Sequence, residues 1–192
     1  MTLRRIGTST HKTRTVLLDA AERLMRESGY AAVTSRRLGA KAGLKPQLVH
    51  YYFRTMDDLF LALFRRFAAG FLQQQSAVLK AKEPLKALWK LTSHPKGVVL
   101  SYEFVALANH RKAIRAEIAD FGDQYRDGQA KILAHILEKK KRHRDLRWPP
   151  LVLAVVLDGL ARILALEHAL GMSKGHAQAR AAIGRIIEEV DG

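Results

Sequence analysis

The chain of 192 residues contains no cysteine, which excludes disulfide bonds, cysteine-ligated zinc and thiol catalysis. This absence is compatible with a cytoplasmic protein, and we expect that location. The basic residues Arg4 and Arg5 are not followed by an apolar run, so the sequence predicts no signal peptide. The most apolar run, 151–157, ends at Asp158 and is far shorter than the ~18 residues that a membrane helix needs.

The chain also lacks the short motifs of common enzymes. It has no glycine-rich phosphate loop, no G-x-S-x-G sequence and no H-E-x-x-H pair among its 8 histidines. Asp158 and Glu167 share one side of a predicted helix, but nine residues separate them by about 13 Å along its axis, too far for a catalytic carboxylate pair. We therefore expect no enzymatic activity, no cofactor and no bound metal.

Acidic residues are scarce beside basic ones, with 18 Asp and Glu against 33 Lys and Arg and a formal net charge of +15. Residues 1–56 hold 11 Lys and Arg against 3 Asp and Glu, whereas residues 57–192 hold 22 against 15. The excess of positive charge per residue is thus more than doubled at the N-terminal end. Such a segment suits the phosphates of a nucleic acid, although charge alone does not establish DNA binding.

Residues 34–53 predict two short helices joined by a tight turn. Thr34 is a suitable N-cap, and Gly39 permits another backbone to cross close to the first helix. Gly43 suits the left-handed end of that helix, and Pro46 suits the first position of the next one. This is the layout of a helix-turn-helix, whose second helix enters the major groove of DNA.

The second helix of this motif carries cationic and hydrogen-bonding side chains on its outward side. We expect such side chains, with those at the start of the first helix, to contact DNA. The predicted contact residues are Thr34, Ser35, Arg36, Lys45, Gln47, Leu48, His50, Tyr51, Tyr52, Arg54 and Thr55.

The same region resembles a known family. The pattern Thr34…Leu38…Ala42-Gly43-Leu44…Tyr51-Tyr52-Phe53…Asp58-Leu59, preceded by the helix 16–25 and by Gly29–Thr34, is similar to the TetR family of bacterial transcriptional regulators. The resemblance covers roughly residues 12 to 65. It implies a homodimer of all-helical subunits that binds an inverted-repeat DNA operator. It also implies repression that a small effector releases by moving the long fourth helix, and we expect that effector to be apolar.

Three positions depart from the family pattern. Lys45 stands where a Ser or Thr often opens the recognition helix, and His50 stands where a phosphate-binding Tyr is common. Met56 replaces a Lys that often follows this helix. We therefore expect phosphate contacts to shift to Lys45, Arg54 and Arg36.

The expected fold is all-α. It comprises an N-terminal three-helix helix-turn-helix domain and a C-terminal helical domain for ligand binding and dimerisation, joined by a long helix that begins at Asp57. We place a flexible basic arm at residues 1–11, the DNA-binding domain at 12–72, and the effector-binding and dimerisation domain at 73–192. Further helices are predicted from Pro84, at 98–108 and at 113–141, with a last one capped by Ser173. The basic run 139–144 reads as a solvated helix end rather than a second nucleic-acid site.

The predicted helix 151–170 is apolar on nearly all sides, so both sides must be covered. One side can face the core of its own subunit and the other a second copy, although one large intrasubunit bundle is the alternative. The predicted dimer-interface residues are Val152, Val155, Gly159, Ile163, Leu166, Leu170, Ile183, Ile186 and Ile187.

Aromatic residues of the C-terminal part can line an effector pocket, although each of them can equally be ordinary core. Glu103 is a further polar candidate, and the pair Glu167-His168 reads as an interface pair. The predicted effector-binding residues are Phe67, Phe71, Trp89, Tyr102, Phe104, Asn109, Phe121, Tyr125 and His168.

The sequence thus predicts a ligand-responsive DNA-binding regulator. A non-specific basic DNA-compacting protein is the alternative, and a third reading is a small-molecule carrier or an enzyme that uses the helical domain alone.

Overall fold

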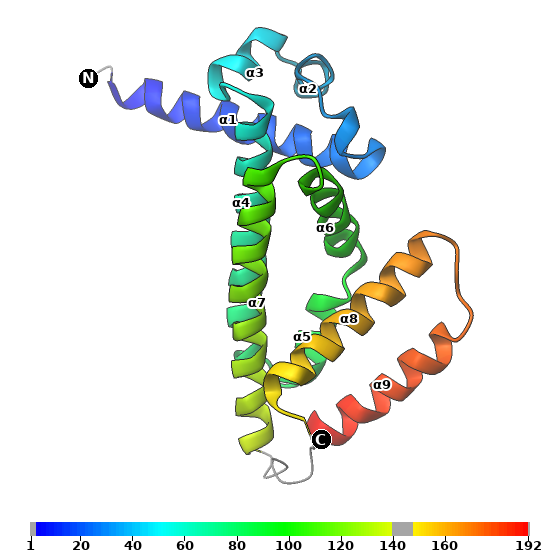
Figure 1. Cartoon of the computed structure of the whole chain (residues 1–192). Helices are drawn as coiled ribbons and strands as arrows, with labels where there is room; N and C mark the ends of the chain where they lie inside the picture. Colours follow the sequence, from blue (N-terminus) through cyan, green and yellow to red (C-terminus); the bar gives the residue numbers. More distant parts are fainter. Residues whose placement is uncertain (1–2, 140–147, 192) are drawn as a thin grey trace. The chain divides into compact units, whose positions relative to one another are not determined.

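The computed structural model describes residues 3–139 and 148–191, and every regular element within them is helical (Figure 1). None of these helices combines the length and apolarity that crossing a membrane requires. The α-helices are α1 (Leu3–Ser28), α2 (Ser35–Ala42), α3 (Pro46–Tyr52), α4 (Met56–Ala77), α5 (Pro84–Thr92), α6 (Pro95–Ala108), α7 (Lys112–Lys139), α8 (Pro150–Ala169) and α9 (His176–Asp191), with 3-10 turns η1 (Tyr30–Ala32) and η2 (Val78–Lys80).

The chain divides into two compact units. The first contains Met1–Ala68 and Leu100–Ile118, and the second contains Ala69–Val99 and Ala119–Gly192. We predicted a single domain boundary near residue 72. Instead, Leu100–Ile118 belongs to the same unit as the N-terminal helices. The physical reason is aromatic packing: Phe104 of α6 is 1% exposed and contacts Phe64 and Phe67 of α4, with ring centroids 5.0 Å and 5.6 Å apart.

Helix α1 is longer than the sequence led us to expect. It begins at Leu3, where we predicted a flexible arm through residue 11, so that prediction is wrong for 3–11. No proline interrupts this segment, and extending an existing helix by one turn costs much less than starting a new one. The later turns of α1 anchor it through a buried stripe that includes Leu17, Ala21 and Leu24.

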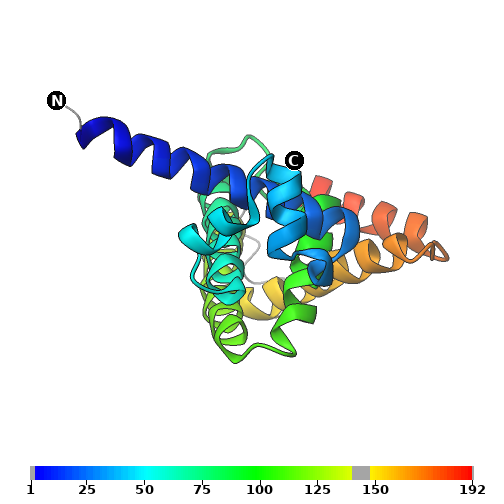
Figure 2. The same ribbon diagram turned by 90° about the horizontal axis from the view of Figure 1, so that it is seen from above.

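Helices α2 and α3 form the predicted helix-turn-helix beside α1 (Figures 1 and 2). The hydroxyl of Thr34 accepts a hydrogen bond from the backbone N–H of Arg37 at 3.3 Å and caps α2. Gly43 ends α2 with φ +67°, and Pro46 occupies the first turn of α3. These local predictions are confirmed by the geometry of the turn.

The start of α4 is fixed by a reciprocal cap between Thr55 and Asp58. The Thr55 hydroxyl accepts from the Asp58 N–H at 3.1 Å, and the Asp58 carboxylate accepts from the Thr55 N–H at 3.0 Å. This arrangement satisfies two backbone donors that would otherwise lack partners.

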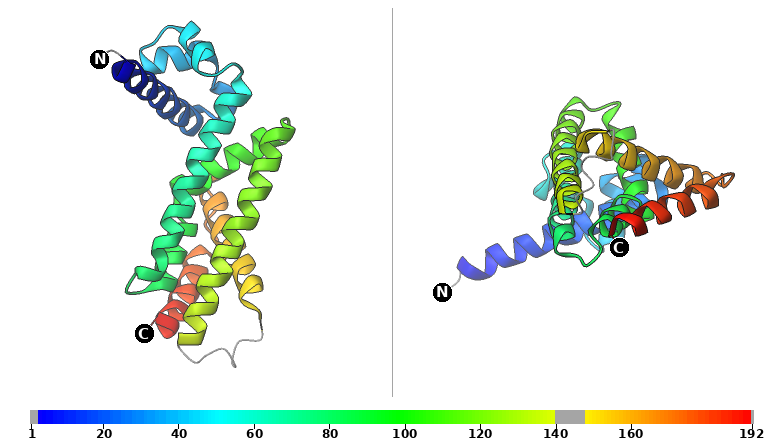
Figure 3. Two further views of the ribbon diagram at one scale, coloured as in Figure 1. Left: turned by 90° about the vertical axis from the view of Figure 1, so that its left-hand side faces the viewer. Right: turned by 90° about the horizontal axis from the view of Figure 1, so that it is seen from below.

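The second unit has its own apolar core, to which α5, α7, α8 and α9 all contribute (Figure 3). Its buried residues are Val78, Leu85, Leu88, Ile132, Leu133, Ile136, Ala154, Leu164, Ile183 and Ile187. The carboxylate of Asp191, at the end of α9, accepts from the backbone N–H groups of Leu85 and Lys86 at 3.1 Å and 2.9 Å. The last helix therefore caps the first turn of α5.

Helices α8 and α9 run antiparallel and are joined by a short connection (Figures 1 and 3). Helix α9 begins at His176, three residues after the predicted cap Ser173, because Gly175 adopts φ +82° just before it. The buried His176 ring bonds the Glu167 carboxylate at 2.7 Å and ties the two helix ends together. The part of the basic run 139–144 that follows Lys139 lies outside the described residues.

The backbone crossing at Gly39 generates the first testable prediction. A Cβ at this position would lie 2.8 Å from the carbonyl oxygen of Leu44 and 3.1 Å from the nitrogen of Pro46. Because both atoms belong to the backbone, Gly39→Ala should force the turn open and lower the free energy of unfolding by about 1–3 kcal/mol, measured by urea denaturation.

Gly70→Ala is the matched control. Gly70 also lies within an α-helix, but a Cβ there would meet nothing within 4 Å. This substitution should raise stability by about 0.5–1 kcal/mol, because alanine loses less backbone entropy on folding. Equal effects of the two substitutions would contradict the proposed role of the crossing.

Candidate functional site

The outward side of α3 is open to solvent. Lys45, Gln47 and His50 are exposed, and Tyr51 is 74% exposed, which is unusual for so large an aromatic side chain. The ring of Tyr51 meets that of Tyr52 edge to face, with centroids 5.1 Å apart. The opposite side of α3 carries the fully buried Val49, so the helix is held by its inner side and presents its polar side outward.

The basic residues around the motif divide into two groups. Lys41 pairs with Glu27 of α1 at 2.6 Å, and Arg37 donates to Ser28 at 3.4 Å, so these cations face the end of α1. Arg36, Lys45 and Arg54 are different. Their side chains are exposed and have no ion-pair or hydrogen-bond partner in the described part of the chain. They are the cations that can bind an anion without first breaking an existing pair.

Several other predicted contact residues either cap a helix or are partly buried. Thr34 and Thr55 are exposed, but their hydroxyls cap α2 and α4. Ser35, Leu48 and Tyr52 are half-buried, so only part of each side chain can reach a ligand. The predicted set therefore lies in one region, with the most accessible chemistry on Arg36, Lys45, Gln47, His50, Tyr51 and Arg54.

Two contacts that support this surface were not predicted. The guanidinium of Arg14 in α1 lies over the ring of Phe53, 5.0 Å from its centroid, and so joins α1 to the end of α3. The Thr55–Asp58 cap could have been recognised from its T-x-x-D spacing. The Arg14 contact had no comparable signal, since it joins residues 39 positions apart.

Glu103 of α6 also has a role that differs from the predicted one. Its carboxylate accepts a hydrogen bond from the backbone N–H of Tyr30 at 2.7 Å and lies against Gly29, which adopts φ +78°. Glu103 thus holds the turn between α1 and α2 rather than offering a polar group to an effector. No local sequence pattern could indicate this contact, because 73 residues separate Tyr30 and Glu103.

The predicted effector residues fall into both units. In the first unit, Phe104 and Phe67 belong to the aromatic core described above, Tyr102 is half-buried, and Asn109 is exposed near the end of α6. These positions are explained by core packing and a helix end. They form no common polar site within that unit.

In the second unit, Phe71, Phe121 and Tyr125 do come together. The rings of Phe121 and Tyr125 stack with centroids 5.7 Å apart, and Phe71 meets Tyr125 edge to face at 5.8 Å. Burial raises the pKa of the Tyr125 hydroxyl above its ordinary value, and the hydrogen bond between this hydroxyl and that of Thr92 opposes the shift. Trp89 instead packs against the apolar core, and His168 is exposed.

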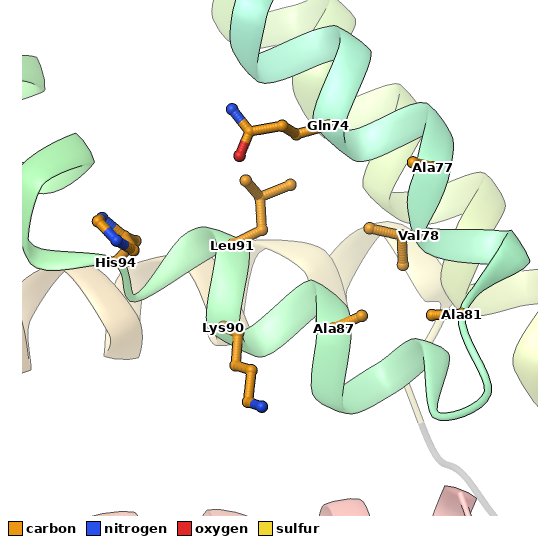
Figure 4. Close-up of a pocket in the computed structure, with 8 residues that line it drawn as sticks. All are labelled: Gln74, Ala77, Val78, Ala81, Ala87, Lys90, Leu91 and His94. Carbon is orange, nitrogen blue, oxygen red and sulfur yellow. The ribbon is translucent and has the colours of Figure 1, made fainter.

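A shallow hollow in the second unit has a volume of about 430 Å³ (Figure 4). Small apolar side chains from the end of α4, from η2, from the connection after it and from α5 form most of its wall. The Lys90 ammonium points away from Leu91 and Gln74. None of the predicted effector residues lines it. Its lining residues are Gln74, Ala77, Val78, Ala81, Ala87, Lys90, Leu91 and His94. Within residues 3–139 and 148–191, no cluster of three metal-ligating side chains is present.

The predicted dimer-interface residues divide between surface and core. One side of α8 is exposed along Val152, Val155, Gly159 and Ile163, and Leu170 follows this helix in the exposed connection. Leu166 is half-buried and Ile186 of α9 is 58% exposed.

The assignment of Ile183 and Ile187 to an interface is wrong. Both are 6% exposed and belong to the apolar core of their own unit. Helix α9 carries isoleucines on two sides, and sequence spacing alone does not identify the side that faces the core. Glu167 likewise pairs with His176 rather than forming the predicted pair with His168.

Comparisons with known proteins agree with this geometry. Residues 17–63 match the sequence model of the family described as bacterial regulatory proteins, tetR family. Over 68 residues the chain is 34% identical to the HTH-type transcriptional regulator BetI of Rhizobium meliloti (strain 1021). That match spans 35% of this chain and about a third, 34%, of the BetI chain.

Solved structures share the fold over most of the chain. A TetR transcription regulator from Haloarcula marismortui has a TM-score of 0.74 at 19% identity, covering 93% of this chain and 98% of its own. A transcriptional regulator from Saccharomonospora viridis, solved in complex with choline, has a TM-score of 0.77 at 20% identity, covering 93% and 96%.

The matched residues 17–63 contain the helix-turn-helix, with its crossing at Gly39 and its open α3 surface. The all-helical fold agrees over nearly the whole length of the solved structures. Residues 17–63 therefore match the tetR family of bacterial regulatory proteins, and the chain shares the fold of solved transcription regulators.

Proposed function

We propose that this regulator is a homodimeric repressor that binds an inverted-repeat operator in the cytoplasm and releases it when a small molecule binds the second unit. The observation that carries the proposal is the open side of α3, where Lys45, Gln47, His50 and Tyr51 are exposed on a helix held by its buried side. Such a helix can enter the major groove without rearrangement.

The exposed side chains supply two kinds of DNA contact. Arg36, Lys45 and Arg54 have no ion-pair partner among the described residues, so each can neutralise a phosphate without losing an existing salt bridge. Gln47 carries an amide that can pair with the edge of adenine, and Tyr51 offers both a ring and a hydroxyl. Phosphate contacts would fix the position of α3, and base contacts would provide sequence specificity.

The exposed stripe of α8 supports dimerisation. Val152, Val155 and Ile163 are between 41% and 44% exposed, and Gly159 between them has no neighbouring atom within 4 Å of a Cβ position. A contiguous apolar stripe of this kind is typically covered by a partner. A two-fold axis through α8 would bring the same stripe from two copies together, and an inverted repeat has matching symmetry.

A small-molecule effector is the third part of the proposal. The structurally similar regulator from Saccharomonospora viridis was solved with choline, so its fold can hold a small ligand. In this chain the second unit contains buried polar groups beside the aromatic residues Phe71, Phe121 and Tyr125. Ligand binding among these helices would be able to change the arrangement of α4, which runs from one unit into the other.

The first functional prediction concerns sequence-specific DNA binding. Selection from a pool of random duplexes with the full-length protein should enrich an inverted repeat. On that sequence, Lys45→Ala and Tyr51→Ala should each weaken binding by about 5- to 150-fold, the loss of roughly 1–3 kcal/mol for one contact. Gel shifts would measure the affinities, and thermal unfolding should be unchanged because both side chains are exposed.

Lys131→Ala is the matched control, because Lys131 is an exposed lysine of α7 in the second unit. Its affinity for the selected sequence should equal that of the wild type. Equal binding of selected and random duplexes, with a steep salt dependence, would instead support a non-specific DNA-compacting protein.

The second functional prediction concerns dimerisation. Val155→Asp should weaken dimerisation by about 100-fold or more, because the two-fold axis would place two carboxylates in one apolar contact. Analytical ultracentrifugation across a concentration series measures the effect. Val105→Asp is the control: Val105 of α6 is 43% exposed and Val155 is 44% exposed, so the two substitutions change equally accessible side chains. If the Val155→Asp protein were still dimeric at the lowest concentration at which the wild type is dimeric, this stripe would be excluded as the interface.

A further inference from the structure

Four buried polar side chains occupy the interior of the second unit. Gln75 of α4, Thr92 of α5, and Tyr125 and Gln129 of α7 are each between 1% and 6% exposed. We call these four residues the buried polar cluster. Polar groups in an apolar helical bundle lower stability unless their hydrogen bonds are complete.

The hydrogen bonds of this cluster are incomplete. Gln75 donates to the backbone oxygen of Tyr125 at 2.7 Å, but the Thr92 and Tyr125 hydroxyls are 3.3 Å apart and the Gln129 amide nitrogen lies 3.4 Å from the Thr92 hydroxyl. These last two contacts are longer than typical hydrogen bonds. The amide oxygen of Gln129 has no partner among the described residues, although Gln129 is 1% exposed.

Reversing the Gln129 amide would change which end of the amide lacks a partner. The Thr92 hydroxyl already donates its proton to the backbone oxygen of Leu88 at 3.0 Å. A reversed amide would therefore place the Gln129 oxygen against another acceptor, with no proton between them. The Tyr125 hydroxyl, which interacts with the same end of the amide, could donate to a reversed Gln129 oxygen, and the amide nitrogen would then take the position that has no partner. In the orientation of the structure, it is the oxygen that lacks a donor.

Aromatic rings lie beside the cluster. Phe121, Tyr125 and Gln129 follow one another at four-residue intervals along one side of α7, and Phe71 of α4 meets Tyr125. Phe71 and Phe121 are only half-buried, so the aromatic group reaches the surface of its unit. Gly97 makes room for Phe71, because a Cβ there would lie 2.9 Å from the Phe71 ring.

The charged side chains near the buried polar cluster already form ion pairs with one another. Asp158 and Arg162 of α8 both act on the Tyr125 hydroxyl, but they form an ion pair with each other at 2.9 Å. Asp158 also pairs with Arg126 at 3.3 Å. A charged ligand would have to disrupt these pairs, whereas a neutral ligand would not.

We propose that the buried polar cluster and the rings of Phe71 and Phe121 form the effector site, and that it takes a neutral, planar, apolar molecule with one N–H or O–H donor directed at the Gln129 oxygen. This inference rests on the proposed effector response and specifies its ligand. Phe71 and Phe121 contact the flat body of the ligand, and Gln129 selects for the donor. Leaving a buried acceptor unpaired disfavours an analogue that lacks the donor.

Indole and benzofuran are the probes, because they have nearly the same shape and differ in a ring N–H against a ring oxygen. Calorimetry on the full-length protein without DNA should give about tenfold tighter binding of indole than of benzofuran. In Gln129→Met this preference should disappear. Phe121→Leu should weaken both ligands together, because it removes a stacking surface and leaves the Gln129 oxygen in place.

Thermal unfolding provides a readout that separates this role from a purely structural one. Gln129→Met replaces an unsatisfied buried amide with an apolar side chain of similar length, so it should raise the melting temperature by about 2–4 °C. If Gln129 only held the helices together, the same substitution would lower it. Gln124→Met, at an exposed position of the same helix, is the control and should change neither binding nor melting.

Several results would each overturn the inference. They are equal binding of indole and benzofuran by the wild type, no binding of indole at millimolar concentration, and unchanged indole preference in Gln129→Met. Choline, bound more tightly than indole, would also contradict the neutral ligand that we propose. Because these measurements use protein without DNA, a failure of operator recognition would leave them unaffected, and the two proposals can fail separately.

Discussion

The close approach of two backbones at Gly39 is the constraint on which the exposed surface of α3 depends. The Leu44 carbonyl and the Pro46 nitrogen lie where a side chain would begin, so α3 can cross α2 only because residue 39 has none. That crossing buries Val49 and leaves Tyr51 exposed on the other side of a helix only seven residues long. A helix this short is not stable by itself, so its orientation comes from packing.

Contacts from other helices maintain this geometry. Arg14 of α1 covers Phe53 after α3, and Glu103 of α6 holds the turn at Tyr30. The Lys41–Glu27 pair uses one cation of α2 for structure, whereas Arg36 has no partner in the described part of the chain. The motif therefore separates cations that hold helices together from cations that remain available to an anion. This division underlies the proposed role in DNA binding.

The sequence predicted the parts of the structure that depend on near neighbours. Thr34, Gly43 and Pro46 act through hydrogen bonds or backbone angles within a few residues, so their types and spacing were sufficient. Residues 100–118 and Ile183 were assigned wrongly, because their environment is set by packing against distant segments.

No sequence pattern predicted that the side-chain oxygen of Gln129 lacks a hydrogen-bond partner. A glutamine on a helix usually faces solvent, and its burial is visible only once α5 and α7 are placed together. The exposed side of α8 was predictable from the sequence only in part. Its apolar character was evident from residues 151–170, but the structure was needed to separate the side of Val155 from the buried side of Ala154.

The central claim is that two copies of α3 read one inverted repeat from the same side of the DNA. Hydroxyl-radical footprinting of the full-length protein on its selected sequence tests this most directly. We predict two protected blocks whose centres lie about 10 base pairs, or a multiple of that, apart on one face of the duplex. A single block, or even protection along the whole fragment, would contradict the account.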